Sequence, residues 1–218
     1  MIFLIFFIKK VYYSILFIIG IILFDTKFIY YPNFFLPNRI YINPIKIKYI
    51  ASIPFKPKFG TPGIIDLDKY VKNISDALQQ NYKAISARQI IQEHIKIENT
   101  LEFQKMLDDG MPYKNVFDYM QSIELMYSQF QNLNFNEPIR DKFFTPGIEV
   151  GLGKEGDLVK VNSGNHRFFG SYFSQINNIP VSLCLFDKNF FEEYSKKNGR
   201  KGWLMLRSFL KKKAENLC

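Results

Sequence analysis

Hydrophobic residues are distributed unevenly along the 218-residue chain, and the longest apolar run lies at its start. Residues 1–8 are wholly apolar, Lys9 and Lys10 interrupt, and residues 11–24 are again almost entirely apolar. Those fourteen residues of helix would span about 21 Å, less than a hydrocarbon core of about 30 Å. Because the run has no polar face and no small-x-small cleavage site follows Phe24, residues 1–31 are predicted to be an uncleaved anchor that spans the membrane or lies in one leaflet.

Prolines punctuate the next stretch, residues 32–65, and rule out a long helix there. Short β-prone pieces at residues 39–42 and 45–53 predict a connector with one or two short strands. Helical spacing follows over residues 66–133. We expect three helices: one from Asp66 to about Tyr82, one from Ser86 to about Leu107 with Gln89 completing a capping box, and one from Lys114 to Leu133.

The pattern changes again over residues 134–195, where short alternating runs favour strands. Residues 148–152 and 158–161 predict a hairpin around a turn at residues 154–157. A glycine-containing loop, Ser163 to Arg167, comes next, followed by an expected helix over residues 168–176 and an apolar strand over residues 181–186. The predicted fold class is α+β, with a small mixed sheet, a helical insertion and an N-terminal membrane-associated helix.

The formal net charge of +9 is carried by the two ends of the chain. Residues 1–58 hold eight basic residues and one acid, residues 59–195 hold thirteen basic residues and eighteen acids, and residues 196–218 hold eight basic residues and one acid. A mildly acidic body argues against DNA binding, whereas basic ends beside apolar runs suit anionic lipid headgroups. Residues 196–218 therefore predict a basic amphipathic helix, which either lies on a membrane surface or packs on the domain.

The loop from Ser163 to Arg167 is the strongest candidate for chemistry. Gly164 permits a sharp turn and a close backbone approach to a ligand, and the start of the next helix offers unpaired N–H groups to an anion. Arg167 adds a forked cation that matches phosphate oxygens, His166 can donate or move a proton near neutral pH, and Ser163 and Asn165 add polar contacts. The alternative is an ordinary helix start with Ser163 or Asn165 as its cap. Two cysteines and two histidines argue against a disulfide framework or a zinc site.

The succession of residues 148–151, 154–158, 161–167 and 179–181 resembles the ParB/sulfiredoxin-like superfamily, in which a strand pair leads into a GxHR loop, a helix and an "IPV" strand. Residues 60–66 more loosely resemble a stretch in uncharacterised members found among cell-surface polysaccharide genes. The resemblance implies that Ser163, Gly164, Asn165, His166 and Arg167 bind the phosphates of ATP or another NTP. Asn165 stands where sulfiredoxins carry their reactive cysteine, which argues against that reaction. The chain after residue 186 is too short for a ParB-like DNA-binding domain, so no DNA partner is expected.

A phosphotransfer reaction needs a base to accept a hydroxyl proton, and His166, Glu149 and Asp66 are the candidates. Asp66 and Asp68, two residues apart after a turn that contains glycine and proline, form a candidate Mg²⁺ pair. The alternative for each is a charge that stabilises the start of the following helix.

Two functions follow as hypotheses. The first is an NTP-dependent phosphotransferase acting on a small or sugar-linked substrate at the membrane, with its body on the cytoplasmic face. The second is a non-catalytic nucleotide- or phosphate-sensing module of a membrane-associated polysaccharide-assembly system. The acidic body and the lack of a metal cluster argue against a nuclease.

Overall fold

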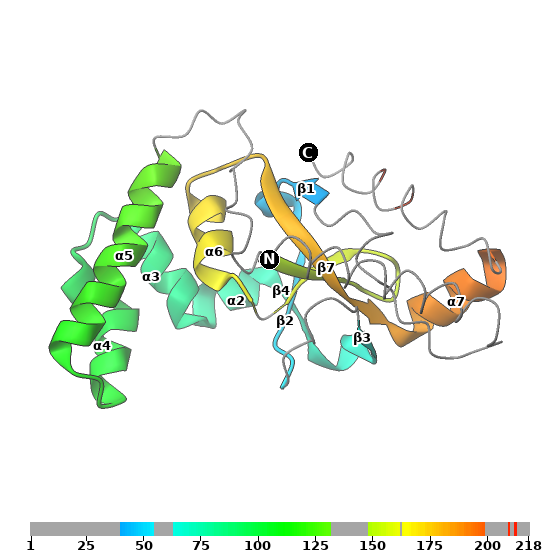
Figure 1. The fold of residues 1–218 in the computed structure, drawn as a ribbon, viewed down its shortest axis with the longest axis horizontal. Helices are drawn as coiled ribbons and strands as arrows, with labels where there is room; N and C mark the ends of the chain where they lie inside the picture. The colour runs from blue at the N-terminus through cyan, green and yellow to red at the C-terminus, as the bar shows by residue number, and fades with distance from the viewer. Residues whose placement is uncertain are drawn as a thin grey trace, which may run out of the picture.

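The computed structural model describes residues 40–54, 63–131, 148–161 and 163–198, together with Phe209 and Lys212. These residues form a mixed α+β fold in which one sheet carries a helical lobe at one end and α7 (Lys188–Asn198) at the other (Figure 1). The fold class predicted from the pattern is confirmed at this level. None of the described helices is long and apolar enough to cross a membrane, and the predicted anchor, residues 1–31, lies outside the described residues.

The described strands make one seven-stranded sheet, and β7 (Ile179–Asp187) organises it. One edge of β7 pairs in parallel with β5 (Ile148–Leu152). Its other edge is shared by β1 (Ile40–Ile42), antiparallel along the first half, and β3 (Gly63–Ile65), parallel along the second half. Beyond β5 the order continues through β6 (Leu158–Lys160), β2 (Tyr49–Ala51) and β4 (Val71–Asn73).

The predicted β5–β6 hairpin is confirmed. Its strands pair antiparallel from Val150 opposite Lys160 to Leu152 opposite Leu158. Gly156 closes the turn with φ of 74°, a left-handed conformation that glycine adopts at little cost. The connector also contains the expected short strands, β1 and β2, but Pro44 begins a 3-10 turn, η1 (Pro44–Lys46), and shortens the second of them.

The first predicted helix begins later than expected. Asp66 precedes a 3-10 turn, η2 (Leu67–Tyr70), and β4 follows before α2 (Ile74–Gln80) starts. The reason is tertiary, because Leu67 is fully buried and its N–H donates to the Asp187 carboxylate at the end of β7. That contact fixes the segment on the sheet, where Val71 pairs with Ala51.

The second predicted helix is divided in two. The structure has α3 (Tyr82–Ile91), a turn in which His94 takes a φ of 53°, the short turn η3 (Ile97–Asn99) and α4 (Leu101–Asp108). Ser86 and Gln89 do cap a helix, but it is α4: Glu102 N–H donates to Ser86 Oγ and Leu101 N–H donates to the Gln89 side chain. The third predicted helix is confirmed as α5 (Tyr113–Gln131).

The main core lies between one face of the sheet and the helices. Strand residues such as Ile148, Val150 and Val181 pack there against Phe168 and Phe169 of α6 (Asn165–Phe173). Phe168 and Phe169 are fully buried, so they belong to the core and do not line an open pocket. In Figure 1, α6 lies between the sheet and the lobe formed by α3, α4 and α5, so that it contacts both.

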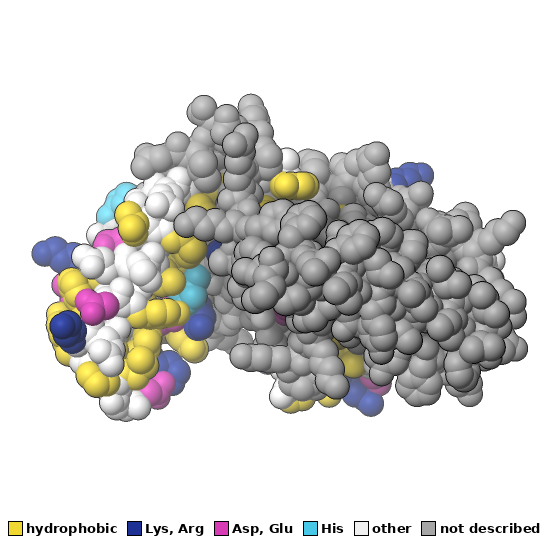
Figure 2. Space-filling view, in the orientation of Figure 1, with side chains coloured by type: hydrophobic (Ala, Val, Ile, Leu, Met, Phe, Trp, Pro, Cys, Tyr) yellow, Lys and Arg dark blue, Asp and Glu magenta, His cyan; other side chains and the backbone are white. Residues whose placement is uncertain are grey.

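The helical lobe also exposes apolar side chains. In Figure 2, hydrophobic side chains gather over α4 and α5 on the face shown, and the large exposed ones of this lobe are Leu101, Met111, Tyr113 and Leu125. At the opposite end of the molecule α7 begins directly after Asp187, whose carboxylate accepts the N–H groups of Asn189 and Phe190. The expected C-terminal helix, residues 196–218, overlaps α7 over its first three residues, and most of it lies outside the described residues.

Candidate functional site

The Ser163 to Arg167 loop joins the end of β6 to the start of α6. Gly164 is the residue before the first turn of α6 and has φ of 75°, which is the left-handed conformation expected of it. The helix starts at Asn165, three residues earlier than predicted, and ends earlier, at Phe173. Asn165, His166 and Arg167 therefore occupy the first helical turn, where N–H groups have no acceptor within the helix.

Lys160 lies directly beneath this loop, and the sequence reasoning missed it. Its side chain is fully buried at the end of β6. Its ammonium donates to the carbonyl oxygens of Val161 and Ser163, the latter at 2.6 Å, and to Asn165 Oδ1 at 2.9 Å. It also lies 5.8 Å from the centre of the Phe168 ring. A lysine within the otherwise apolar run of residues 158–161 was the available signal, because charged residues are seldom fully buried without partners.

Burial sets the protonation behaviour around Lys160. Loss of hydration lowers the pKa of the Lys160 ammonium to about 7, and the negative charge of Glu149 on β5 partly offsets that shift. Burial likewise raises the pKa of the Cys184 thiol on β7, and Glu149 adds to that effect. Glu149 itself is half-buried, and its Oε2 has no hydrogen-bond partner among the described residues.

His166 points away from the loop and into the helical lobe. Its Nε2 lies 2.8 Å from the Tyr119 hydroxyl and 3.3 Å from Glu102 Oε1, and its Nδ1 lies 3.3 Å from the Tyr127 hydroxyl. The Glu102 side chain is only 2% exposed, so the contact is a buried one. Both ring nitrogens are thus occupied by residues of α4 and α5, and the imidazole joins α6 to the lobe.

The hydroxyl groups around His166 are held neutral. Burial raises the pKa of Tyr119 to about 12 and raises the pKa of Tyr127 further, and the charge of Glu102 adds to both shifts. Glu102 Oε2 has no hydrogen-bond partner among the described residues. A buried carboxylate, an imidazole and two phenols therefore form a polar cluster within an otherwise apolar interface.

Asp66 and Asp68 lie far from Glu149, which is next to Val150, the residue paired with Lys160 at the end of β6. Ile65, next to Asp66, pairs with Asp187 at the carboxyl end of β7, whereas Glu149 pairs with Ser182 near its other end. Five strand residues at about 3.3 Å each separate these positions by roughly 17 Å. Asp66 pairs instead with Lys69, at 2.9 Å. The described residues contain no group of three His, Cys, Asp or Glu side chains placed to hold a metal ion.

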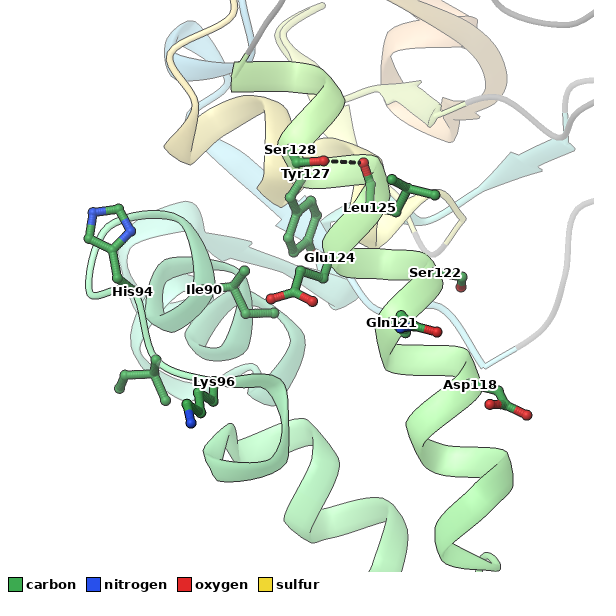
Figure 3. A pocket seen from close by; sticks show the side chains of 11 residues that line it. Ile90, His94, Lys96, Asp118, Gln121, Ser122, Glu124, Leu125, Tyr127 and Ser128 are labelled. Carbon is green, nitrogen blue, oxygen red and sulfur yellow. Dashed lines mark hydrogen bonds between the residues drawn. The ribbon is translucent and has the colours of Figure 1, made fainter.

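A groove of about 810 Å³ lies between α5 and the segment that follows α3. Figure 3 shows the Glu124 side chain of α5 directed toward the segment that carries His94 and Lys96, whereas Asp118 and Ser122 project from the opposite side of the helix. Tyr127 lines both this groove and the cluster around His166. The loop residues Ser163 to Arg167 are not part of its lining.

Comparison with known proteins gives no match for this chain, whether against family models, curated proteins or solved structures. The resemblance to the ParB/sulfiredoxin-like superfamily thus remains a prediction from the motif alone.

Proposed function

We propose that this chain binds nucleotide phosphates at the Ser163 to Arg167 loop, with ATP or another NTP as the ligand. The observation that carries the proposal is the arrangement around Gly164: a left-handed glycine opens the first turn of α6 while Lys160 holds the carbonyl oxygens of the preceding chain. The N–H groups at the start of a helix attract an anion, and they do so better when the nearby carbonyl oxygens are bound elsewhere, as Lys160 binds them here. Arg167 adds a cation in the same helical turn.

The geometry supports nucleotide binding without turnover better than it supports catalysis. The chain would then be a nucleotide- or phosphate-sensing module of a membrane-associated polysaccharide-assembly system. Asp66 and Asp68 lie near the other end of β7, and both nitrogens of His166 already have partners. In this proposal Mg²⁺ arrives coordinated by the phosphates of the nucleotide, as is common for that ion. Asp66 and Asp68 are not assigned to it.

A phosphotransferase acting on a small or sugar-linked substrate is the second candidate, and the contact between Glu102 and His166 favours it. A buried carboxylate beside an imidazole fixes the orientation of the ring, as a general base requires. In both cases we propose that the body works at the cytoplasmic face of a membrane, because residues 1–31 are largely apolar and both ends are basic.

Calorimetric titration of the full chain in detergent micelles with ATP and Mg²⁺ tests the proposal. Arg167→Ala should weaken binding about tenfold or more, the loss of one charge-assisted contact. Arg88→Ala is the matched control, because Arg88 lies on α3 in an exposed ion pair with Glu93. ADP release measured in parallel separates a phosphotransferase from a sensor. The absence of ATP binding, or equal affinities for the Arg167→Ala and wild-type chains, would contradict the proposal.

A further inference from the structure

The ammonium of Lys160 is surrounded by three oxygen acceptors that all belong to the loop region. These are the carbonyl oxygens of Val161 and Ser163 and the side-chain Oδ1 of Asn165. A protonated lysine has three N–H donors and no acceptor, so it can satisfy all three oxygens. A neutral amine has two N–H donors and a lone pair, so at least one oxygen would lose its partner and face a lone pair instead.

This contact also orients the backbone of the loop. Because the peptide bond is planar and trans, the carbonyl of Ser163 and the N–H of Gly164 point in opposite directions. Lys160 holds the Ser163 carbonyl inward, and the Gly164 N–H is therefore directed away from Lys160. The bond to Asn165 Oδ1 ties the first residue of α6 to the same point.

We propose that Lys160 is the positioning residue of the phosphate loop, and that loss of its proton releases the loop and weakens anion binding. This inference rests on the function proposed above, because it names the group that controls the same site. Lys160 acts through the backbone and does not touch the ligand.

The groups that face Lys160 place its titration in the physiological range. Glu149 approaches from β5 and raises the pKa of the ammonium, Cys184 lies on β7, and burial outweighs both and brings that pKa to about 7. On α6 it meets Asn165 and the Phe168 ring. His166, next along that helix, is bound to Glu102, Tyr119 and Tyr127 instead.

The test is the affinity of the full chain for ATP with Mg²⁺ between pH 6 and 8.5, compared with Lys160→Arg and Lys160→Met. As pH rises across this range, the affinity of the wild-type chain should fall about tenfold more than that of Lys160→Arg, because arginine keeps its charge throughout. Titration of the nucleotide is common to both proteins and cancels in the comparison. Lys160→Met should bind weakly at every pH. Equal pH profiles for wild type and Lys160→Arg would overturn the proposal.

Glu149→Gln supplies a second variant that leaves Lys160 in place. Removing this negative charge lowers the pKa of the ammonium further, so the fall in affinity should move to lower pH. An unchanged midpoint would contradict the proposal even if Lys160→Arg failed to fold.

Hydrogen exchange of the Ser163 to Asn165 amides without ligand separates the two proposals. Exchange in these amides, corrected for its intrinsic pH dependence, should rise in wild type as pH passes 7, and in Lys160→Arg it should not. If ATP fails to bind but exchange behaves this way, the proposed function is wrong and the role of Lys160 in holding the loop stands. If ATP binds and exchange shows no such difference, the role of Lys160 is wrong and the binding function stands.

Discussion

Burying the Lys160 side chain costs free energy of folding, and the size of this cost depends on pH. Between a folded pKa of about 7 and the ordinary value of 10.5, the unfolded chain binds a proton at this position that the folded chain does not. Stability must therefore rise with pH across that window, because the unfolded state holds more protons. Below pH 7 both states are protonated and the full cost of burial applies.

We expect the free energy of unfolding of wild type, relative to Lys160→Met, to rise between pH 7 and 10 with a slope of up to about 1.4 kcal/mol per pH unit. Chemical denaturation of both proteins at several pH values measures it. The tyrosines and other titrating groups are common to both chains and cancel in the difference. A constant difference across this range would mean that Lys160 is not buried in the folded protein.

Glu102 and His166 should be coupled energetically. Removing one member of a buried pair leaves the other without a partner, so His166→Ala should destabilise the protein by about 3 kcal/mol, partly through the stranded Glu102 carboxylate. Glu102→Gln in the His166→Ala background should recover part of that loss. The double-mutant cycle, measured by denaturation, should give a coupling of about 1–3 kcal/mol. Additive effects would show that the contact is not energetically significant.

Lys160 and Glu102 mark the limit of what could be predicted from sequence. The β5–β6 hairpin, the Gly164 turn and α5 were predicted because their signals are local: a turn glycine, alternation, and helical spacing. Lys160 and Glu102 acquire their roles only when β6, α4 and α6 come together, and nothing in their immediate neighbours states those contacts. Ser86 and Gln89 illustrate the same point. Their spacing correctly indicated capping residues, but they cap α4, which the fold brings to them, and not the helix in which they lie.

At the scale of elements, α5 and α6 pack tightly at Gly170. A Cβ at this position would lie 2.5 Å and 2.7 Å from two ring carbons of Tyr127, and 3.1 Å from Phe130. Tyr127 is 1% exposed, so its ring has little room to move. The absence of a side chain at residue 170 is therefore what lets the two helices pack and lets Tyr127 reach His166.

Gly170→Ala should destabilise the protein by about 1–3 kcal/mol, the usual cost of overpacking a core, even though alanine favours helix formation. It should also disturb the contact between Tyr127 and His166, which NMR shifts of the His166 ring would report. Gln175→Gly is the contrasting variant, because Gln175 has φ of 56° and glycine should be tolerated or slightly stabilising there. A stabilised Gly170→Ala would mean that the helices are further apart than the structure has them.

At the scale of the whole molecule, charge and sequence position divide the chain into an acidic body and two basic ends. The Ser163 to Arg167 loop, where we propose that phosphate binds, leads into α6, which contacts both the sheet and the helical lobe. Strand β7 ends at Asp187, directly before α7. The part of the sequence expected to meet a membrane, residues 1–31, is separate from the loop along the chain. Membrane attachment and phosphate binding should therefore be separable by mutation.

The full chain should co-float with lipid vesicles through its apolar N-terminal residues and should prefer anionic over neutral vesicles. Each basic residue near an anionic surface contributes about 1 kcal/mol, so changing Lys211, Lys212 and Lys213 to glutamine should reduce that preference, with ATP affinity unchanged. The matched control changes Lys69, Lys72 and Lys188 to glutamine, an equal loss of charge from exposed positions on the body. Flotation at low and at high salt measures both, because salt screens the headgroup attraction but not apolar insertion. An equal loss of anionic preference in the control would show that net charge alone, and not the C-terminal segment, directs the chain to the membrane. A chain that stays in the soluble fraction with every vesicle would remove the membrane from the proposed function and leave the phosphate loop to be tested by itself.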